Sequence, residues 1–306
     1  MTIKSTTQAS SPVVKEQTKK RKGNFFRANR GDSKFKRLII HLILIGYCII
    51  SIYPLLRIFS VSLRPGNRVL STDLSIIPDD ATWENYRKVL FDQGLLQWIW
   101  NSLAVTITTS IIGLIIASTS AYAFSRFKFK GRTPLLIYLL TTQMIPTSML
   151  MVPLYILAIK LGMVGTYRGL VIAYAVTSVP FSIWILKGYY DTIPTELEEA
   201  AIIDGASPLQ AFWKIILPLS TPALAITFLF NFSQAWNEFL IARVILGSQE
   251  SILTWPLGLN RLMGQYLVQW GQYNAASIIV SIPVMILFLA ASKYMISGLT
   301  LGSVKG

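Results

Sequence analysis

Residues 194–218 read PTELEEAAIIDGASPLQAFWKIILP, a polar stretch inside a chain that is otherwise strongly apolar. Thr195 followed by Glu198 matches the capping-box pattern and predicts that a helix starts here. Asp204 and Gly205 predict the end of this helix, because glycine accepts the left-handed conformation that follows many helices. We therefore expect a short helix closed by a fixed turn.

A second short helix is predicted to follow the turn. Ser207 is a good cap, and Pro208 suits the first helical position. Four apolar side chains at helical spacing predict one apolar stripe. These are Leu209, Phe212, Trp213 and Ile216. Leu217-Pro218 is predicted to end the helix, and Thr221-Pro222 to start the next one by the same cap-plus-proline pattern.

The first of these helices is acidic. It carries Glu196, Glu198 and Glu199 and has no Lys or Arg. An anionic lipid surface attracts basic rather than acidic segments. We therefore expect this helix pair to contact a protein rather than to lie as an ordinary pair in the lipid interface.

The composition around this stretch indicates a membrane protein. Of 306 residues, 53% are hydrophobic and only 14% are charged, and mean hydropathy is +0.52. Charge is too scarce to cover a water-facing surface of this size. The single cysteine, Cys48, excludes a disulfide scaffold, and with the single histidine, His41, it leaves a His/Cys metal site almost without ligands. No cofactor is expected.

Six segments are long and apolar enough to cross a bilayer, which takes about 20 residues. The first is too long for a secretory signal and has no cleavage site after it, so it is interpreted as an uncleaved span. The six predicted spans are Leu38–Leu63, Trp98–Phe124, Pro134–Leu157, Gly169–Leu186, Pro222–Ala242 and Asn274–Ile296.

Basic residues predict the orientation. Residues 1–37 hold 11 of the 28 Lys and Arg, and the short connection 125–133 carries a dense basic cluster. Positive loops stay in the cytoplasm, so both termini and residues 187–218 are predicted to be cytoplasmic. The basic run at 19–22 leads directly into an apolar segment, and we interpret it as a tail that touches anionic lipid rather than nucleic acid.

Three spans carry further signals. The second has a small or hydroxylated residue on one face at Ser102, Thr106, Thr109, Gly113, Ala117 and Ser120. Helix packing is favoured there over a pathway lining, because small residues allow backbones to approach. In the third span, Pro146 and Pro153 predict kinks.

The fifth span is the most polar. Amides and a carboxylate at bilayer depth normally face a cavity or a partner. A hydrophilic pathway lining is predicted for Asn231, Gln234, Asn237 and Glu238. Arg243 is a candidate ion-pair partner for Glu238.

The stretch at 194–218 resembles the EAA motif of ABC importer permeases. The matching residues are Glu199, Ala200, Ala201, Asp204, Gly205, Ala206, Phe212, Ile215, Leu217 and Pro218. The resemblance to type I permeases covers residues 98–297. It implies an all-α, polytopic, six-span (MetI-like) fold, with residues 188–218 as a coupling loop that docks on a separate ATPase and rocks the spans between inward-open and outward-open states.

Narrower features resemble carbohydrate permeases. Residues 236–239 (WNEF) have this character, and residues 62–67 and 298–306 resemble the smaller permease subunit of maltose/maltodextrin importers. The implied partners are a second, larger permease, two ATPase copies and an extracytoplasmic sugar-binding protein, in a prokaryotic cell membrane. The implied layout is a tail at 1–37, a first helix and outer loop at 38–97, the transmembrane domain at 98–297 and a tail at 298–306 directed toward the ATPase. Residues 243–273 are directed toward the binding protein.

The sequence also bears on alternative functions. It contains no G-x-x-x-x-G-K-[ST] phosphate loop and no nucleophile elbow, so the chain is not expected to be an enzyme, and ATP hydrolysis must come from a partner. An ion-coupled secondary transporter, a membrane enzyme or scaffold, and a permease for another oligosaccharide such as a galactoside remain open.

Overall fold

The computed structural model of the chain describes residues 33–66, 75–264 and 268–302. The chain divides into two compact units, Met1–Leu55 and Leu56–Gly306. Most of the predicted basic tail and the last four residues of the predicted C-terminal tail lie outside the described residues.

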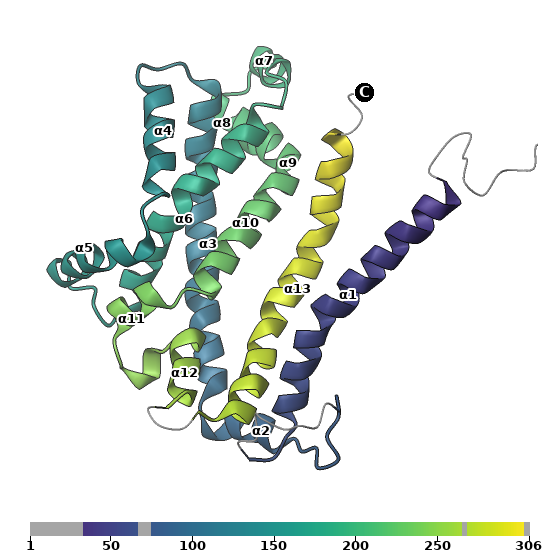
Figure 1. Cartoon of the computed structure of the whole chain (residues 1–306). Coiled ribbons are helices and arrows are strands. Elements are labelled where there is room, and N and C mark those ends of the chain that lie inside the picture. Colours follow the sequence, from purple (N-terminus) through teal and green to yellow (C-terminus); the bar gives the residue numbers. More distant parts are fainter. Residues whose placement is uncertain (1–32, 67–74, 265–267, 303–306) are drawn as a thin grey trace, which may run out of the picture. The chain divides into compact units, whose positions relative to one another are not determined.

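Every regular element in the described ranges is a helix, as the sequence predicts. The helices are α1 (Lys34–Ser62), α2 (Glu84–Arg87), η1 (Lys88–Asp92), α3 (Leu95–Arg126), α4 (Arg132–Thr142), α5 (Thr147–Lys160), α6 (Tyr167–Tyr190), α7 (Glu196–Ile203), α8 (Pro208–Ala211), η2 (Phe212–Ile216), α9 (Leu217–Leu219), α10 (Thr221–Trp236), α11 (Leu240–Leu246), η3 (Glu250–Ile252), α12 (Trp255–Leu262) and α13 (Trp270–Gly302). Figure 1 shows the long helices α3, α6, α10 and α13 of the second unit.

Four helices in the described ranges are long and apolar enough to cross a membrane unbroken, and the number rises to six if each of two bent helix pairs is one span. The first pair is Arg132–Thr142 with Thr147–Lys160, and the second is Pro208–Leu219 with Thr221–Trp236, which meet at 78°. The four are α1, α3, α6 and the Trp270–Tyr294 part of α13. They correspond to the first, second, fourth and sixth predicted spans.

The third predicted span is not one helix. Its halves, α4 and α5, meet at an angle of 99°. Pro146 immediately precedes α5 in an extended conformation, with ψ 133°. Because proline has no N–H to donate and disfavours helix in the residue before it, the hydrogen-bond ladder of α4 stops there. Pro153 lies inside α5 without ending it.

The fifth predicted span is also shorter than expected. α10 ends at Trp236, and a separate helix, α11, starts at Leu240. The Glu238 carboxylate accepts hydrogen bonds from the backbone N–H groups of Ile241 (2.8 Å) and Ala242 (3.0 Å). Glu238 therefore satisfies the free N–H groups at the start of α11, and in the described structure it does so in place of the predicted ion pair with Arg243.

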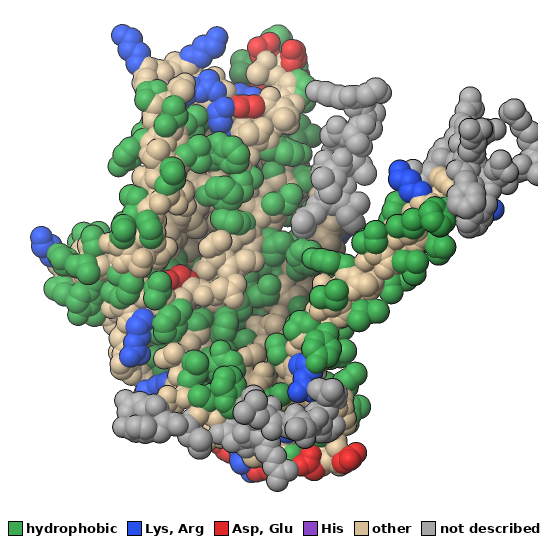
Figure 2. All heavy atoms as spheres, in the orientation of Figure 1, with side chains coloured by type: hydrophobic (Ala, Val, Ile, Leu, Met, Phe, Trp, Pro, Cys, Tyr) green, Lys and Arg blue, Asp and Glu red, His purple; other side chains and the backbone are tan. Residues whose placement is uncertain are grey.

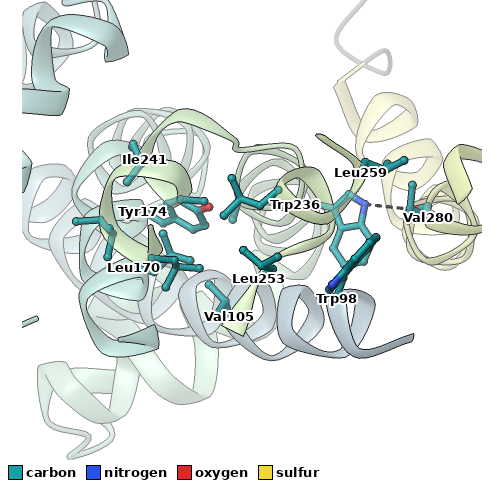
Figure 3. Close-up of a cluster of buried hydrophobic side chains, with 14 of the residues drawn as sticks. Trp98, Val105, Leu170, Tyr174, Trp236, Ile241, Leu253, Leu259 and Val280 are labelled. Carbon is teal, nitrogen blue, oxygen red and sulfur yellow. Dashed lines mark hydrogen bonds between the residues drawn. The ribbon is translucent and has the colours of Figure 1, made fainter. Parts of the chain in front are cut away.

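The second unit is organised around α3, which packs mainly against α6 and α10. Five of the six small or hydroxylated residues predicted on one face of this helix are buried, and Ser120 is half-buried. The preferred interpretation, helix packing, therefore holds. Figure 3 shows one of the two hydrophobic clusters found in the described part of the chain. In it, Trp236 donates its indole N–H to the Val280 carbonyl at 3.2 Å.

The surface has the pattern of a membrane protein. Figure 2 shows acidic and basic side chains gathered mainly at the end of the second unit that carries α7 and at the opposite end, with a largely apolar belt in between. Such a belt matches the hydrocarbon core of a bilayer.

The contact between α12 and α3 is very close. A Cβ atom added at Gly258 would lie 2.0 Å from the Trp98 ring, and Trp98 is buried. We expect Gly258→Ala to destabilise the protein by about 1–3 kcal/mol, as overpacked cores generally do. Thermal unfolding of the detergent-solubilised protein measures this, and the midpoint should fall by several degrees.

Gly46→Ala is the matched control, because it makes the same exchange inside a helix where nothing lies within 4 Å. Equal unfolding midpoints for the two variants would show that the Trp98 contact is not tight in solution.

Candidate functional site

The segment from Thr195 to Pro218 folds into the predicted pair of short helices, at one end of the second unit (Figure 1). Gly205 lies between them with φ +89°, a left-handed conformation that favours glycine. The Ala206 N–H donates to the Ala201 carbonyl at 2.9 Å and closes the end of α7. The predicted turn is confirmed.

The start of the second helix is also confirmed. The Ser207 hydroxyl accepts a hydrogen bond from the Gln210 N–H (3.3 Å), and the Gln210 side chain accepts one from the Ser207 N–H (2.8 Å). Pro208 occupies the first turn. This reciprocal capping box fixes the direction of the chain after the turn.

The capping box predicted at Thr195 is wrong. Thr195 makes no side-chain cap hydrogen bond to α7. The Glu198 carboxylate instead forms an ion pair with Arg126 and accepts a hydrogen bond from the Tyr122 hydroxyl at 2.7 Å. Both partners lie near the end of α3, so tertiary contacts replace the local cap.

The predicted apolar stripe of the second helix divides between two sides. Phe212 and Ile216 are 2% and 0% exposed, whereas Leu209 and Trp213 are 66% and 55% exposed. The helix continues as a π turn over Phe212–Ile216. Because the i→i+5 bonding of a π turn alters the angular register of an α-helix, positions that would align in an α-helix separate. The helix extends through α9 to Leu219, one residue past Pro218.

The buried half of the stripe attaches the segment to the long helices. Phe212 and Ile216 belong to a hydrophobic cluster with residues of α3 and α6. The centroids of the Phe212 and Tyr122 rings are 4.7 Å apart. The segment is therefore held firmly at η2.

The other half leaves an exposed apolar surface, here called the coupling face. Its members are Leu197, Ile202, Ile203, Leu209 and Trp213, each at least 45% exposed. These residues project at the charged end of the unit, which also carries the short connection between α3 and α4 (Figures 1 and 2). Exposed apolar patches with a polar surround mark interaction surfaces.

The motif residues lie within this segment. Glu199, Ala200, Asp204, Gly205 and Pro218 are exposed, while Ala201, Ala206 and Leu217 are half-buried and Phe212 is buried. The side chains of Glu199 and Asp204 are thus available to a partner.

The polar residues of the fifth predicted span do not all meet. Gln234 and Glu238 line a pocket of about 170 Å³ between the α4–α5 bend, α6 and the α10–α11 turn. Asn231 is fully buried and accepts a hydrogen bond from Ser182 at 2.7 Å. Asn237 is exposed and donates to the Ser233 carbonyl at 2.8 Å.

The pocket also contains residues that the sequence did not single out. They are Gln143, Thr147, Tyr174, Thr177, Ser178, Phe230, Ala235 and Ile241. The break between α4 and α5 and the break between α10 and α11 both border this pocket. Irregular backbone at membrane depth is tolerated where it is buried in protein or lines a cavity, so the breaks and the polar pocket explain each other.

Comparisons with known proteins define the class. Residues 109–297 match the family described as "Binding-protein-dependent transport system inner membrane component". The chain belongs to this family and is a membrane-embedded permease subunit of an ABC importer. Subunits of this class are not themselves catalytic.

Individual relatives match over nearly the whole chain. The "Maltose/maltodextrin transport system permease protein MalG" of Salmonella typhimurium is 36% identical over 294 residues, which is 90% of this chain and 98% of that protein. The "Galactooligosaccharides transport system permease protein GanQ" of Bacillus subtilis is 37% identical over 283 residues, 90% of this chain and 99% of that protein.

The fold is shared with solved importers. A chain of a bacterial ABC transporter involved in the import of the acidic polysaccharide alginate superposes with a TM-score of 0.73 at 26% identity, covering 88% of this chain and 99% of that one. The MetNI methionine ABC transporter gives a TM-score of 0.53 at 19% identity and supports the fold alone.

Proposed function

We propose that the chain is the permease subunit of an importer for maltose/maltodextrin-type oligosaccharides, which it moves across the cell membrane by alternating access driven by ATP hydrolysis on a partner. The observation that carries this proposal is the similarity to MalG proteins over 90% of the chain. Its partners are a second, larger permease, two ATPase copies and an extracytoplasmic sugar-binding protein.

The end of the unit that carries α7 faces the cytoplasm in this proposal. Lys128, Lys130 and Arg132 lie at or next to the connection between α3 and α4, at the same end as α7 (Figure 1). Positive loops favour the cytoplasm. With six spans, which are α1, α3, the bent pair α4–α5, α6, α10 and α13, both termini are then cytoplasmic, and residues 243–273 face the binding protein.

The loop 188–218 serves as the coupling loop. Its exposed carboxylates and the coupling face offer both charge and apolar area to a cleft of the ATPase, a combination typical of interfaces that have an apolar core and a polar rim. The positive-φ turn at Gly205 and the capping box at Ser207 keep the two helices at a set angle. A push on this loop is then passed to the spans rather than absorbed by bending.

The pocket between α5, α6, α10 and α11 forms part of the sugar pathway. Its lining combines amides, hydroxyls and a carboxylate with the rings of Tyr174 and Phe230. Few convergent polar groups within an apolar frame are usual for small-molecule sites. Of the four residues predicted to line the pathway, Gln234 and Glu238 line this pocket, and we assign the pathway role to these two.

Uptake by the reconstituted complex tests the function. Proteoliposomes containing both permeases and the ATPase should accumulate labelled maltotriose only with the binding protein outside and ATP on the ATPase side. Preference for a β-galactoside trisaccharide would instead favour the galactooligosaccharide alternative. Uptake that needs an ion gradient and no ATP would contradict the proposal.

Charge reversal at Glu199 tests the docking role of the loop. Glu199 is exposed on α7. Losing one member of a close interfacial charge pair costs about 2–5 kcal/mol. We expect Glu199→Lys to reduce the amount of ATPase that co-purifies with the tagged permease by roughly tenfold or more.

Glu84→Lys makes the same charge change in an exposed position at the opposite end and should leave the co-purified ATPase at its normal amount. A normal yield with Glu199→Lys would refute the docking role.

A further inference from the structure

The attachment of α7 to the rest of the unit is unusual. Within α7, all of which the structure describes, Glu198 is the one buried residue. The apolar side chains Leu197, Ile202 and Ile203 are 45%, 47% and 85% exposed. A helix of this kind is normally held by an apolar face, but the side chain that faces inward here is a carboxylate.

This carboxylate is fully engaged by the end of α3. One oxygen pairs with the Arg126 guanidinium, and the two side chains are only 10% and 9% exposed. The other oxygen accepts the Tyr122 hydroxyl at 2.7 Å. Arg126 also donates to the Ile193 carbonyl at 3.0 Å, in the short connection that leads from α6 into α7. We call Tyr122, Arg126 and Glu198 the latch.

The latch is strong and directional. Charge-assisted hydrogen bonds are shorter and stronger than neutral ones, and burial reduces their screening by salt. Removing one partner of a buried pair leaves an uncompensated charge, so the pair opposes separation of α7 from α3.

The opposite end of α3 is attached to residues 251–255, here called the outer segment. The Asn101 amide donates to the carbonyls of Ser251 (3.1 Å) and Leu253 (2.9 Å). The Ser102 hydroxyl accepts the Trp255 N–H at 2.8 Å. α3 has 32 residues without a break, and so spans roughly 48 Å at 1.5 Å per residue.

We propose that the latch residues are positioning residues that make α3 the rod linking the coupling loop to the outer segment Ser251–Trp255. A push on α7 reaches α3 through the buried carboxylate, and α3 delivers it to the outer segment along its length. The inference rests on the proposed function, because it assumes that a partner moves α7.

Glu198→Gln tests the latch in the complete complex. The variant keeps the shape of the side chain and removes its charge. In proteoliposomes we expect maltotriose uptake per ATP hydrolysed to fall roughly tenfold, within the usual range of coupling between linked sites, while ATP hydrolysis stays near the normal rate. Glu84→Gln, which removes a carboxylate from an exposed pair at the opposite end, should leave the ratio unchanged.

Tyr122→Phe is the milder variant, because it keeps the ion pair and the ring contact with Phe212 and removes only the hydroxyl. A drop of roughly two- to fivefold in the ratio is expected, smaller than for Glu198→Gln, because one hydrogen bond of the carboxylate is lost and its ion pair remains. This variant decides the question if Glu198→Gln does not assemble.

The outcomes separate the two proposals. An unchanged ratio in an assembled Glu198→Gln complex, or in Tyr122→Phe when the first variant does not assemble, overturns the latch while ATP-driven uptake by the unmodified complex still supports the importer. Absence of ATP-driven uptake in the unmodified complex overturns the proposed function, and the latch with it.

A reporter just before the outer segment, at Ser248, gives a second readout that a merely structural role would not move. A thiol-reactive dye on Ser248→Cys, in a Cys48→Ala background, should change its emission when ATP is added to the complex. With Glu198→Gln we expect this change to disappear. A full-sized signal in an assembled Glu198→Gln complex would show that α7 reaches the outer segment by another route.

Discussion

Replacing Gly205 with valine is expected to reduce ATP-dependent sugar uptake roughly 10- to 100-fold while the protein still inserts into the membrane. Gly205 has φ +89°, and a non-glycine residue held in such a region costs about 1–3 kcal/mol. Among the described residues, and apart from the chain neighbours of Gly205, no atom lies within 4 Å of the added Cβ, so the effect comes from the backbone alone. The turn would relax, and α7 and α8 would no longer keep their angle. Uptake into proteoliposomes measures the loss.

Gly46→Val provides the matched control. Gly46 lies within α1, outside the coupling loop, also with open space around the added Cβ and without a positive φ. It should transport at close to the normal rate. Normal uptake by Gly205→Val would count strongly against a stiff coupling loop.

The second large effect is expected at Trp213. Its ring is 55% exposed on the coupling face, and interface tryptophans often contribute at least about 2 kcal/mol. We expect Trp213→Ala to weaken the affinity of the permease pair for the ATPase by roughly 30-fold or more. Binding of the purified ATPase to the permeases in nanodiscs measures this directly.

Trp100→Ala is the control, because Trp100 is 68% exposed near the start of α3, at the opposite end. Equal affinities for the two variants would mean that the coupling face does not contact the ATPase. Stability in detergent should be similar for both, since neither ring is buried.

Hydropathy predicted the long helices because their signal is local and continuous. α1, α3, α6 and α13 each contain an uninterrupted apolar run, and the predicted ends lie within a few residues of the observed ones. The breaks in the third and fifth spans were harder to locate. A hydropathy window records how apolar a segment is but does not record the direction of the chain.

The two breaks differ in how visible they are from sequence. Pro146 signals an interruption, although not an angle of 99°. The break after Trp236 depends on Glu238, whose carboxylate caps α11. Read from sequence, the same residue predicts a pathway group, and it does line the pocket. Its capping role depends on the path of the backbone, which hydropathy does not record.

The coupling loop shows the same division between local and tertiary signals. Gly205 and Ser207 act on their immediate neighbours, so their roles follow from spacing. Glu198 pairs with a residue 72 positions away, and no spacing rule identifies that partner. Arg126 was interpreted only as one of several cytoplasmic basic residues. A buried ion pair of this kind becomes visible only in the folded structure.

The most direct test of the central claim labels a cysteine placed at Ile203, which is 85% exposed at the tip of α7. In an Ile203→Cys, Cys48→Ala chain, a membrane-impermeant maleimide should react in inside-out vesicles and not in right-side-out vesicles, and the assembled ATPase should protect the cysteine from it. Reaction from the outside, or equal reaction from the inside with and without ATPase, would contradict the account.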